Sequence, residues 1–187
     1  AVAKKYAGIG ASLVAHIKNT RTPFSIDFGV GDVIVPKQEK RKIPTQLDDF
    51  ASPTVNTYSL ETTIAEKLDA ILDLMEFSSR MKDYYDIYYL ANKFDFDGAT
   101  LTKALKKTFE NRGHAFTIEQ FEQVMAFAEN EAMQKKWKAF CRKIDTKTAD
   151  FNTVLKTIKE FLVEPFMAAV ENKEFEEKWT TLESKWH

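Results

Sequence analysis

The chain changes character near residue 58, and this change limits the folds that it can adopt. Four of its six glycines and four of its five prolines lie before this point, among β-branched residues and short apolar–polar alternations. These features favour strands and loops. After residue 58 the apolar residues recur every three to four positions, which favours helices. We therefore predict an α+β chain, with a partial sheet over residues 1–57 and a mainly helical region over residues 58–187.

The sheet region contains a segment, residues 23–36, in which apolar residues alternate with other residues. On a strand, Ile26, Phe28 and Val30 share one face, and Asp27 lies on the opposite face. If the apolar face packs against a layer of helices, Asp27 faces an open surface. Asp27 is thus the first candidate for a functional side chain.

The helical region starts at Ser59, a residue type that suits a helix N-cap, and Glu61 in the first turn suits the helix dipole. A second helix is predicted to begin at Ser78 or Ser79. Further helices are predicted at about 99–111, 117–129, 131–144, 150–163 and 165–171, with a last segment near 175–186.

Charged residues stand at unusual places on the first two predicted helices. Lys67 falls beside the apolar stripe of the first helix, whereas Asp69 and Asp73 lie opposite that stripe. On the second helix, Asp83 lies near the centre of the apolar face and Asp86 lies at its edge. A buried carboxylate without a partner costs several kcal/mol, so Asp83 must find a cation, hydrogen-bond donors, a metal or an exposed helix end.

A purely structural explanation exists for each of these residues. Lys67 can extend from the apolar stripe to water, and Asp83 can pair with Arg80 one turn earlier on its helix. The four tyrosines between residues 84 and 89 fit a helix packed on several sides more easily than a base-stacking platform. From the residues alone, the structural and the functional explanations both stay open.

Composition argues against several classes of protein. The net charge of −1 provides no overall field for nucleic acid, so a polyanion must be held by a local patch. No apolar run approaches the length of a membrane span, and the first residues lack a signal-peptide pattern, which predicts a cytoplasmic protein without a membrane partner. The single cysteine, Cys141, can form neither a disulfide within the chain nor a zinc cluster alone. The three histidines are widely separated and lack metal-ligand spacing.

Three segments resemble, in order and spacing, the second, third and fourth motifs of the AbiEii/AbiGii family of nucleotidyltransferase toxins. They are Asp27 beside the Gly31–Asp32 turn, residues 65–70 and residues 82–87. The resemblance implies a nucleotidyltransferase-like sheet followed by a helical bundle. It also implies a cytoplasmic toxin of a bacterial toxin–antitoxin or abortive-infection system, with a cognate antitoxin as a partner. Such a toxin uses Mg²⁺ to transfer a nucleotide from a nucleoside triphosphate to an acceptor such as tRNA.

The same resemblance implies a role for each candidate residue. Asp27 corresponds to one carboxylate of a two-metal site and is therefore the expected metal ligand. Lys67 is expected to bind the nucleotide's phosphates as a point charge. Asp83 and Asp86 are expected to orient Lys67 and the nucleotide or to supply a base, and the sequence does not decide between these tasks.

The chain departs from the family pattern before Asp27. Family members carry a Gly-Ser or Gly-Gly turn followed by an Asp-x-Asp strand, and no such segment precedes Asp27 here. Because two metal ions need several carboxylates, we expect an N-terminally truncated fragment that is inactive by itself. The alternative is a noncatalytic interaction module on a degenerate nucleotidyltransferase scaffold. The coding sequence directly upstream of Ala1 distinguishes these two interpretations.

Overall fold

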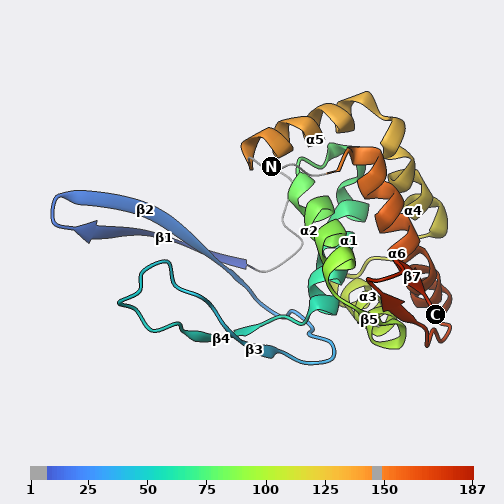
Figure 1. Ribbon diagram of the computed structural model, residues 1–187, viewed down its shortest axis with the longest axis horizontal. Coiled ribbons are helices and arrows are strands. Elements are labelled where there is room, and N and C mark those ends of the chain that lie inside the picture. The colour runs from blue at the N-terminus through green and yellow to red at the C-terminus, as the bar shows by residue number, and fades with distance from the viewer. Residues whose placement is uncertain (1–7, 145–148) are drawn as a thin grey trace. The chain divides into compact units, whose positions relative to one another are not determined.

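The structure is a computed structural model, which describes residues 8–144 and 149–187 (Figure 1). Contacts between residues divide the chain into two compact units, one up to Val33 and one from Ile34 to His187. Helices and small antiparallel sheets occur together, as predicted for an α+β chain. The change of sequence character at residue 58 lies inside the second unit, just before its first helix. The assignment of residues 1–57 to a nucleotidyltransferase sheet stays a prediction.

The first unit contains one antiparallel hairpin of β1 (Gly8–Ile17) and β2 (Thr20–Gly29). Its register pairs Ile9 with Phe28 and Gly10 with Asp27. Because side chains alternate along a strand, Ile26 and Phe28 lie on one face together with the apolar residues of β1 that pair with them. Asp27 lies on the other face, opposite Gly10, as the alternation predicts. Val30 follows the last residue of β2.

The second unit begins with a short hairpin of β3 (Glu39–Lys42) and β4 (Thr54–Thr57). The chain before it is fixed to the first helix by hydrogen bonds at Val35. The backbone N–H of Val35 donates to the Thr62 hydroxyl at 2.8 Å, and the Ser59 hydroxyl donates to the Val35 carbonyl oxygen. Ser59 is the N-cap predicted from the sequence, since its side chain also accepts a hydrogen bond from the backbone N–H of Thr62.

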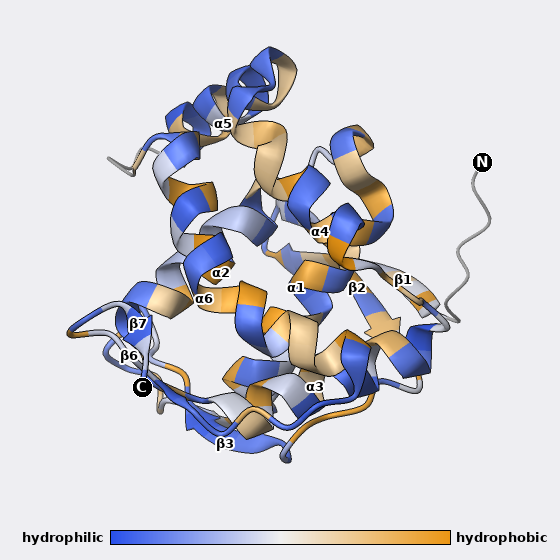
Figure 2. Ribbon diagram, turned by 90° about the vertical axis from the view of Figure 1, so that its right-hand side faces the viewer, coloured by the Kyte–Doolittle hydropathy of each residue, from blue (hydrophilic) through white to orange (hydrophobic). Residues whose placement is uncertain are grey.

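Six α-helices form most of the described part of the second unit: α1 (Leu60–Leu74), α2 (Met81–Lys93), α3 (Gly98–Arg112), α4 (Ile118–Met125), α5 (Glu131–Lys143) and α6 (Phe151–Glu171). Short 3₁₀ segments follow α1 at Met75–Phe77 and α4 at Ala126–Glu129. The helices carry both hydrophobic and hydrophilic residues (Figure 2), so each helix can bury an apolar side and leave a polar side in water. Among the described helices, none is long and apolar enough to span a bilayer.

The core lies where α6 packs against α2, α3 and α4 and where α1 packs against α2 and α3. Side chains from all these helices are completely buried there, including Leu68, Tyr84, Leu101, Phe121 and Phe161. The core is rich in aromatic rings, and the rings of Phe121 and Phe166 stack with their centroids 4.8 Å apart. It holds α1 and α2 side by side, and these two helices carry three of the four candidate residues.

Two predicted helices are a single helix in the structure. The prediction divided residues 150–171 before Pro165, but α6 continues from Phe151 to Glu171 with Pro165 inside it. A proline removes one backbone hydrogen bond and crowds the preceding turn. Phe161 and Phe166, on either side of Pro165, are fully buried. We infer that burial of these rings outweighs the cost of the proline.

The predicted last helical segment, residues 175–186, is a hairpin instead. β6 (Lys178–Thr180) and β7 (Lys185–Trp186) pair with each other, and β6 also pairs with β5 (Phe96–Asp97). Trp179 is buried and its indole N–H donates to the Ala91 carbonyl oxygen at 2.8 Å. Because that carbonyl belongs to a distant part of the chain, tertiary packing decided the conformation of this segment.

Candidate functional site

Lys67 lies between two carboxylates of the neighbouring helix. Its Nζ atom is 3.2 Å from Oδ1 of Asp83 and 2.5 Å from Oδ2 of Asp86. Lys67 extends from α1, while the two aspartates lie one turn apart on α2 and therefore point to the same side of that helix. The packing of α1 against α2 thus brings together three of the four residues that the sequence singled out.

Two further cations complete this group. Nε of Arg80 is 2.6 Å from Oδ2 of Asp83, and Nζ of Lys82 is 2.5 Å from Oδ2 of Asp86. We call the five side chains, Lys67, Arg80, Lys82, Asp83 and Asp86, the Lys67 cluster. Each carboxylate therefore contacts two cations. Asp83 pairs with Arg80, as the structural explanation requires, and with Lys67 at the same time.

The Lys67 cluster is partly open to solvent and carries more positive than negative charge. Asp83 is only 4% exposed, whereas Lys67 and Asp86 are each 18% exposed and Arg80 and Lys82 are mainly exposed. Three cations face two carboxylates. An anionic group that approaches Lys67 would find a net positive charge and ammonium and guanidinium donors.

Asp27 belongs to the hairpin of the first unit and not to the Lys67 cluster's unit. Its carboxylate lies on the face of the hairpin that also carries Ser12, Ser25 and His16. The role of Asp27 as a metal ligand stays a prediction. Within residues 8–144 and 149–187, no three His, Cys, Asp or Glu side chains come together in a way that could hold a metal ion. A two-metal site needs several carboxylates, of which Asp27 would be one.

A second charged group, which sequence reasoning missed, lies on the other side of α1. Asp69 is almost fully buried, and its carboxylate contacts Nη1 of Arg112 and Nδ1 of His114, both at 2.8 Å. Arg112 also pairs with Glu66, and Nε2 of His114 is 3.6 Å from Oδ1 of Asp73. We call these five side chains the Asp69 cluster.

Asp69, which was predicted opposite the apolar stripe of the first helix, is buried in the structure. The helix α3 packs over that side and covers it. Burial raises the pKa of Asp69 to about 6, while the hydrogen bond and the charge of His114 oppose the rise. The spacing of Glu66, Asp69 and Asp73 along one side of the helix was the signal, because a stripe of acids at helical spacing can pair with another helix.

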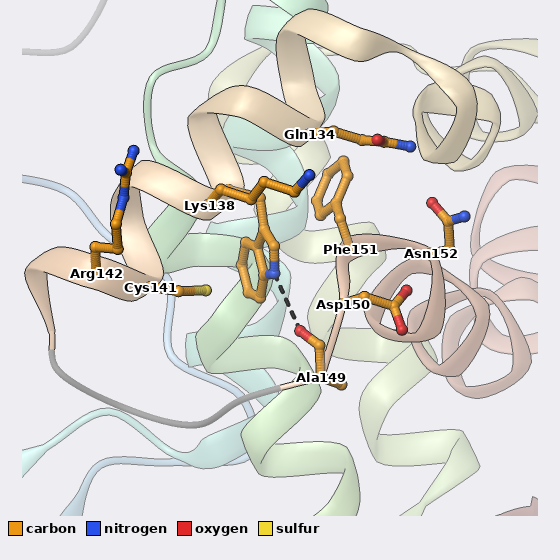
Figure 3. Close-up of a pocket in the computed structure, with 9 residues that line it drawn as sticks. Gln134, Lys138, Cys141, Arg142, Ala149, Asp150, Phe151 and Asn152 are labelled. Atoms are coloured by element: carbon orange, nitrogen blue, oxygen red, sulfur yellow. Dashed lines mark hydrogen bonds between the residues drawn. The ribbon is translucent and has the colours of Figure 1, made fainter.

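An open cavity of about 690 Å³ lies between the C-terminal half of α5 and the start of α6 (Figure 3). Lys138 and Arg142 of α5 line it. The indole N–H of Trp137 donates to the Ala149 carbonyl oxygen at 3.1 Å across it. No candidate residue lines this cavity. Two lining residues, Arg142 and Ala149, stand in sequence on either side of residues 145–148, which lie outside the described part of the chain, so we assign no function to the cavity.

Comparison with known proteins supports the resemblance drawn from the motifs. A family model described as "Nucleotidyl transferase AbiEii toxin, Type IV TA system" matches residues 2–179. The match covers nearly the whole chain, including Asp27, Lys67, Asp83 and Asp86. No curated protein and no solved structure matches the chain.

Proposed function

Because the chain belongs to the AbiEii family of nucleotidyl transferase toxins of type IV toxin–antitoxin systems, we propose that the Lys67 cluster is its nucleotide-binding site. The reaction is transfer of a nucleotide from a nucleoside triphosphate to an acceptor such as tRNA. The observation that carries the proposal is the position of Lys67, which is partly exposed and held between Asp83 and Asp86. Family membership alone does not select this cluster.

Lys67 binds the phosphates in this proposal. A lysine ammonium group has three donors and no acceptor, so Nζ can keep one carboxylate partner while it donates to a phosphate oxygen. Asp83, which is nearly buried, keeps Arg80 as a partner and holds Lys67 in place. Asp86 is more exposed and shares Lys82. It is therefore the better placed of the two acids to orient the nucleotide or to accept a proton from an acceptor.

Metal chemistry requires more carboxylates than Asp27 alone supplies. Nucleotidyl transfer generally uses divalent metal ions, which neutralise the triphosphate and activate the acceptor hydroxyl. We propose that Asp27 contributes one ligand to such a Mg²⁺ site. Since a single carboxylate cannot hold two ions, we expect the 187-residue chain by itself to bind a nucleoside triphosphate without turnover.

The family also implies a protein partner. A toxin of a toxin–antitoxin system acts in opposition to a cognate antitoxin, and we propose that this chain has one. An acceptor such as tRNA places the action of the toxin in the cytoplasm. Neither assignment depends on the Lys67 cluster, so each can fail without affecting the nucleotide-binding proposal.

Nucleotide binding tests the proposal directly. We expect Lys67→Met to weaken binding of a nucleoside triphosphate by about tenfold or more, because a charge-assisted contact contributes roughly 1.5–3 kcal/mol. Lys156→Met is a matched control, since Lys156 is mainly exposed and pairs only weakly, at 3.9 Å, with Glu160 on α6. Titration calorimetry measures both affinities. Equal affinities for the wild type and Lys67→Met contradict the proposed site.

A transfer assay then separates an enzyme from an interaction module. Labelled nucleoside triphosphate, Mg²⁺ and bulk tRNA are incubated with the chain, and label in the RNA is measured. We expect none. Label that disappears in Asp27→Ala shows that the chain is catalytic and that other residues of this chain supply the remaining metal ligands. If the chain neither binds the triphosphate nor transfers a nucleotide and still binds a protein partner, it is the noncatalytic module that the sequence left as an alternative.

A further inference from the structure

Aromatic rings form a ladder on the outer side of α2. Tyr85 and Tyr89 stack, with ring centroids 6.3 Å apart and planes 23° apart, and the ring of Phe140 from α5 lies 5.8 Å from Tyr85. Tyr89 is 48% exposed. The expectation that the tyrosines pack into a core holds for Tyr84, which is fully buried against Phe151. It does not hold for Tyr89, which leaves a large part of its ring in solvent.

Basic residues lie near these rings along α2 and α5. The helix α5, which supplies Phe140, has five basic residues and one acidic residue among its 13 residues, in a chain whose net charge is −1. On helical spacing, Lys82 lies one turn before Tyr85, Lys93 one turn after Tyr89, and Lys143 one turn after Phe140. Each ring thus has a cation within one helical turn. The local charge is positive, as the binding of a polyanion requires.

The ladder is continuous with the Lys67 cluster. Lys82, Asp86, Tyr89 and Lys93 follow one another at spacings of three or four along α2 and so lie on one side of that helix. Asp86 contacts both Lys67 and Lys82, which balance its charge. A single strand of nucleic acid that lies along the rings can therefore reach Lys67 without crossing a region of uncompensated negative charge.

We propose that the ladder of Tyr85, Tyr89 and Phe140, with the basic residues beside it, binds the single-stranded part of the acceptor RNA. Proteins that bind single-stranded nucleic acid combine a positively charged track with aromatic rings on which bases stack. An acidic peptide would use the charge but not the exposed ring of Tyr89, so this ring favours RNA. The inference rests on the proposed function, because it places the acceptor beside the nucleotide site.

Direct binding tests the inference without NTP or metal, so its outcome does not depend on catalysis. A fluorescein-labelled single-stranded RNA of about 12 nucleotides, a length within the usual site size, is titrated with the chain and followed by fluorescence anisotropy. We expect Tyr89→Ala to raise the Kd by about tenfold, since stacking on one ring contributes a factor of that order. Tyr89→Phe keeps the ring and should stay within about twofold of the wild type.

Phe50→Ala is the matched control for a lost exposed ring. Phe50 is 62% exposed and lies between β3 and β4, outside the ladder. The Kd of the Phe50→Ala variant for the RNA should remain within about twofold of the wild-type value. An effect of Phe50→Ala as large as that of Tyr89→Ala means that binding follows any exposed ring, and it overturns the inference.

The salt dependence of binding separates stacking from charge. Removal of one phosphate-contacting cation should reduce the slope of log Kd against log salt by about 0.7 for a single strand. We expect this reduction for Lys143→Ser and no change of slope for Tyr89→Ala. A Tyr89→Ala variant with wild-type RNA affinity overturns the inference. If nucleotide binding still depends on Lys67 in that case, the proposed function stands while the RNA surface fails.

Polyglutamate serves as the probe for an acidic protein partner. It has charge but no bases, so its affinity should be the same for the wild type and Tyr89→Ala. An equal loss of affinity for polyglutamate and for RNA in Tyr89→Ala assigns the ladder to an acidic protein and overturns the RNA inference.

Discussion

The two charged clusters of α1 begin from residues only two positions apart, yet they differ in exposure and in charge. Lys67 and Asp69 point to opposite sides of the helix because two residues correspond to about 200° of rotation. The Lys67 cluster has more cations than acids, and Lys67 is partly exposed. The Asp69 cluster has three acids against Arg112 and His114, and its central carboxylate is 1% exposed.

This difference separates a ligand site from a structural contact. A cluster with surplus charge at the surface can exchange one of its contacts for a ligand at little cost to the fold. A buried carboxylate whose partners come from another segment contributes to stability only while those partners remain, since an unpaired buried charge is strongly unfavourable. We therefore expect substitutions in the Asp69 cluster to affect unfolding, and substitutions in the Lys67 cluster to affect ligand binding.

The largest effect on stability is expected for Arg112→Ala. The substitution leaves Asp69 and Glu66 without their guanidinium partner, and loss of one partner from a buried ion pair costs about 3–5 kcal/mol. Urea unfolding at neutral pH measures the change. Lys106→Ala, on the same helix and 40% exposed, is the control with little expected effect. A cost for Arg112→Ala no greater than that of the control removes the distinction between the clusters.

The pH dependence of stability gives the next largest effect. The pKa of Asp69 is about 6 in the folded chain, above its usual 3.8. The folded state therefore binds the proton more tightly, and the stability that this proton contributes is complete below pH 3.8 and is lost as the pH rises through about 6. Asp69→Asn cannot ionise and lacks this loss. Relative to the wild type, its free energy of unfolding should rise by about 2 kcal/mol between pH 4 and pH 7.

His114→Gln sharpens the same experiment. His114 lowers the pKa of Asp69 through its hydrogen bond and its charge. Without it, the pKa of Asp69 should rise further, and the loss of stability should extend to higher pH. If the free energy of unfolding changes with pH in the same way for Asp69→Asn and the wild type between pH 4 and pH 7, Asp69 does not titrate in this range.

A smaller loss of stability is expected for Lys67→Met. Asp83 keeps Arg80 and Asp86 keeps Lys82, so that no carboxylate loses its last cation. We expect a cost of about 1–2 kcal/mol, in the range of a single charge-assisted hydrogen bond, together with the loss of nucleotide affinity proposed above. A cost equal to that of Arg112→Ala indicates that the Lys67 cluster is also primarily structural.

The smallest effect is expected for Lys82→Ala. The side chain of Lys82 is 71% exposed, and exposed helical ion pairs contribute about 0.3–0.5 kcal/mol. Asp86 retains Lys67 in this variant. Thermal unfolding at low and at high salt should show a small difference that salt reduces further. A salt-independent loss of several kcal/mol would mean that Lys82 is part of the folded core.

Much of the helical region could be predicted from local patterns. The apolar stripes and the N-cap at Ser59 identified α1, and the apolar face that surrounds Asp83 identified α2. The position of Asp83 near the centre of that face predicted that it needs a cation, and Arg80 and Lys67 both contact it. These predictions succeeded because helix formation and side-chain direction depend on residues three and four positions apart.

Other features depend on partners that are distant in sequence. The segment from Phe175 has helical spacing of aromatic residues, but it forms strands because Trp179 packs under α2 and β6 pairs with β5. No local pattern showed that α3 covers Asp69 on the side of α1 opposite the apolar stripe. The catalytic assignment of Asp27, and the roles of Asp83 and Asp86, stay predictions from the family motifs.

The sequence by itself determined most of the helices, which side of α1 and α2 is apolar, and the family to which the chain belongs, since these follow from local spacing and motif order. Only the tertiary structure decided which charges meet. Lys67 contacts Asp83 and Asp86, and Asp69 contacts Arg112 and His114, because α2 and α3 pack on different sides of α1. Ion pairs act over a few ångströms, and the distance between groups remote in sequence is fixed by packing of the whole core.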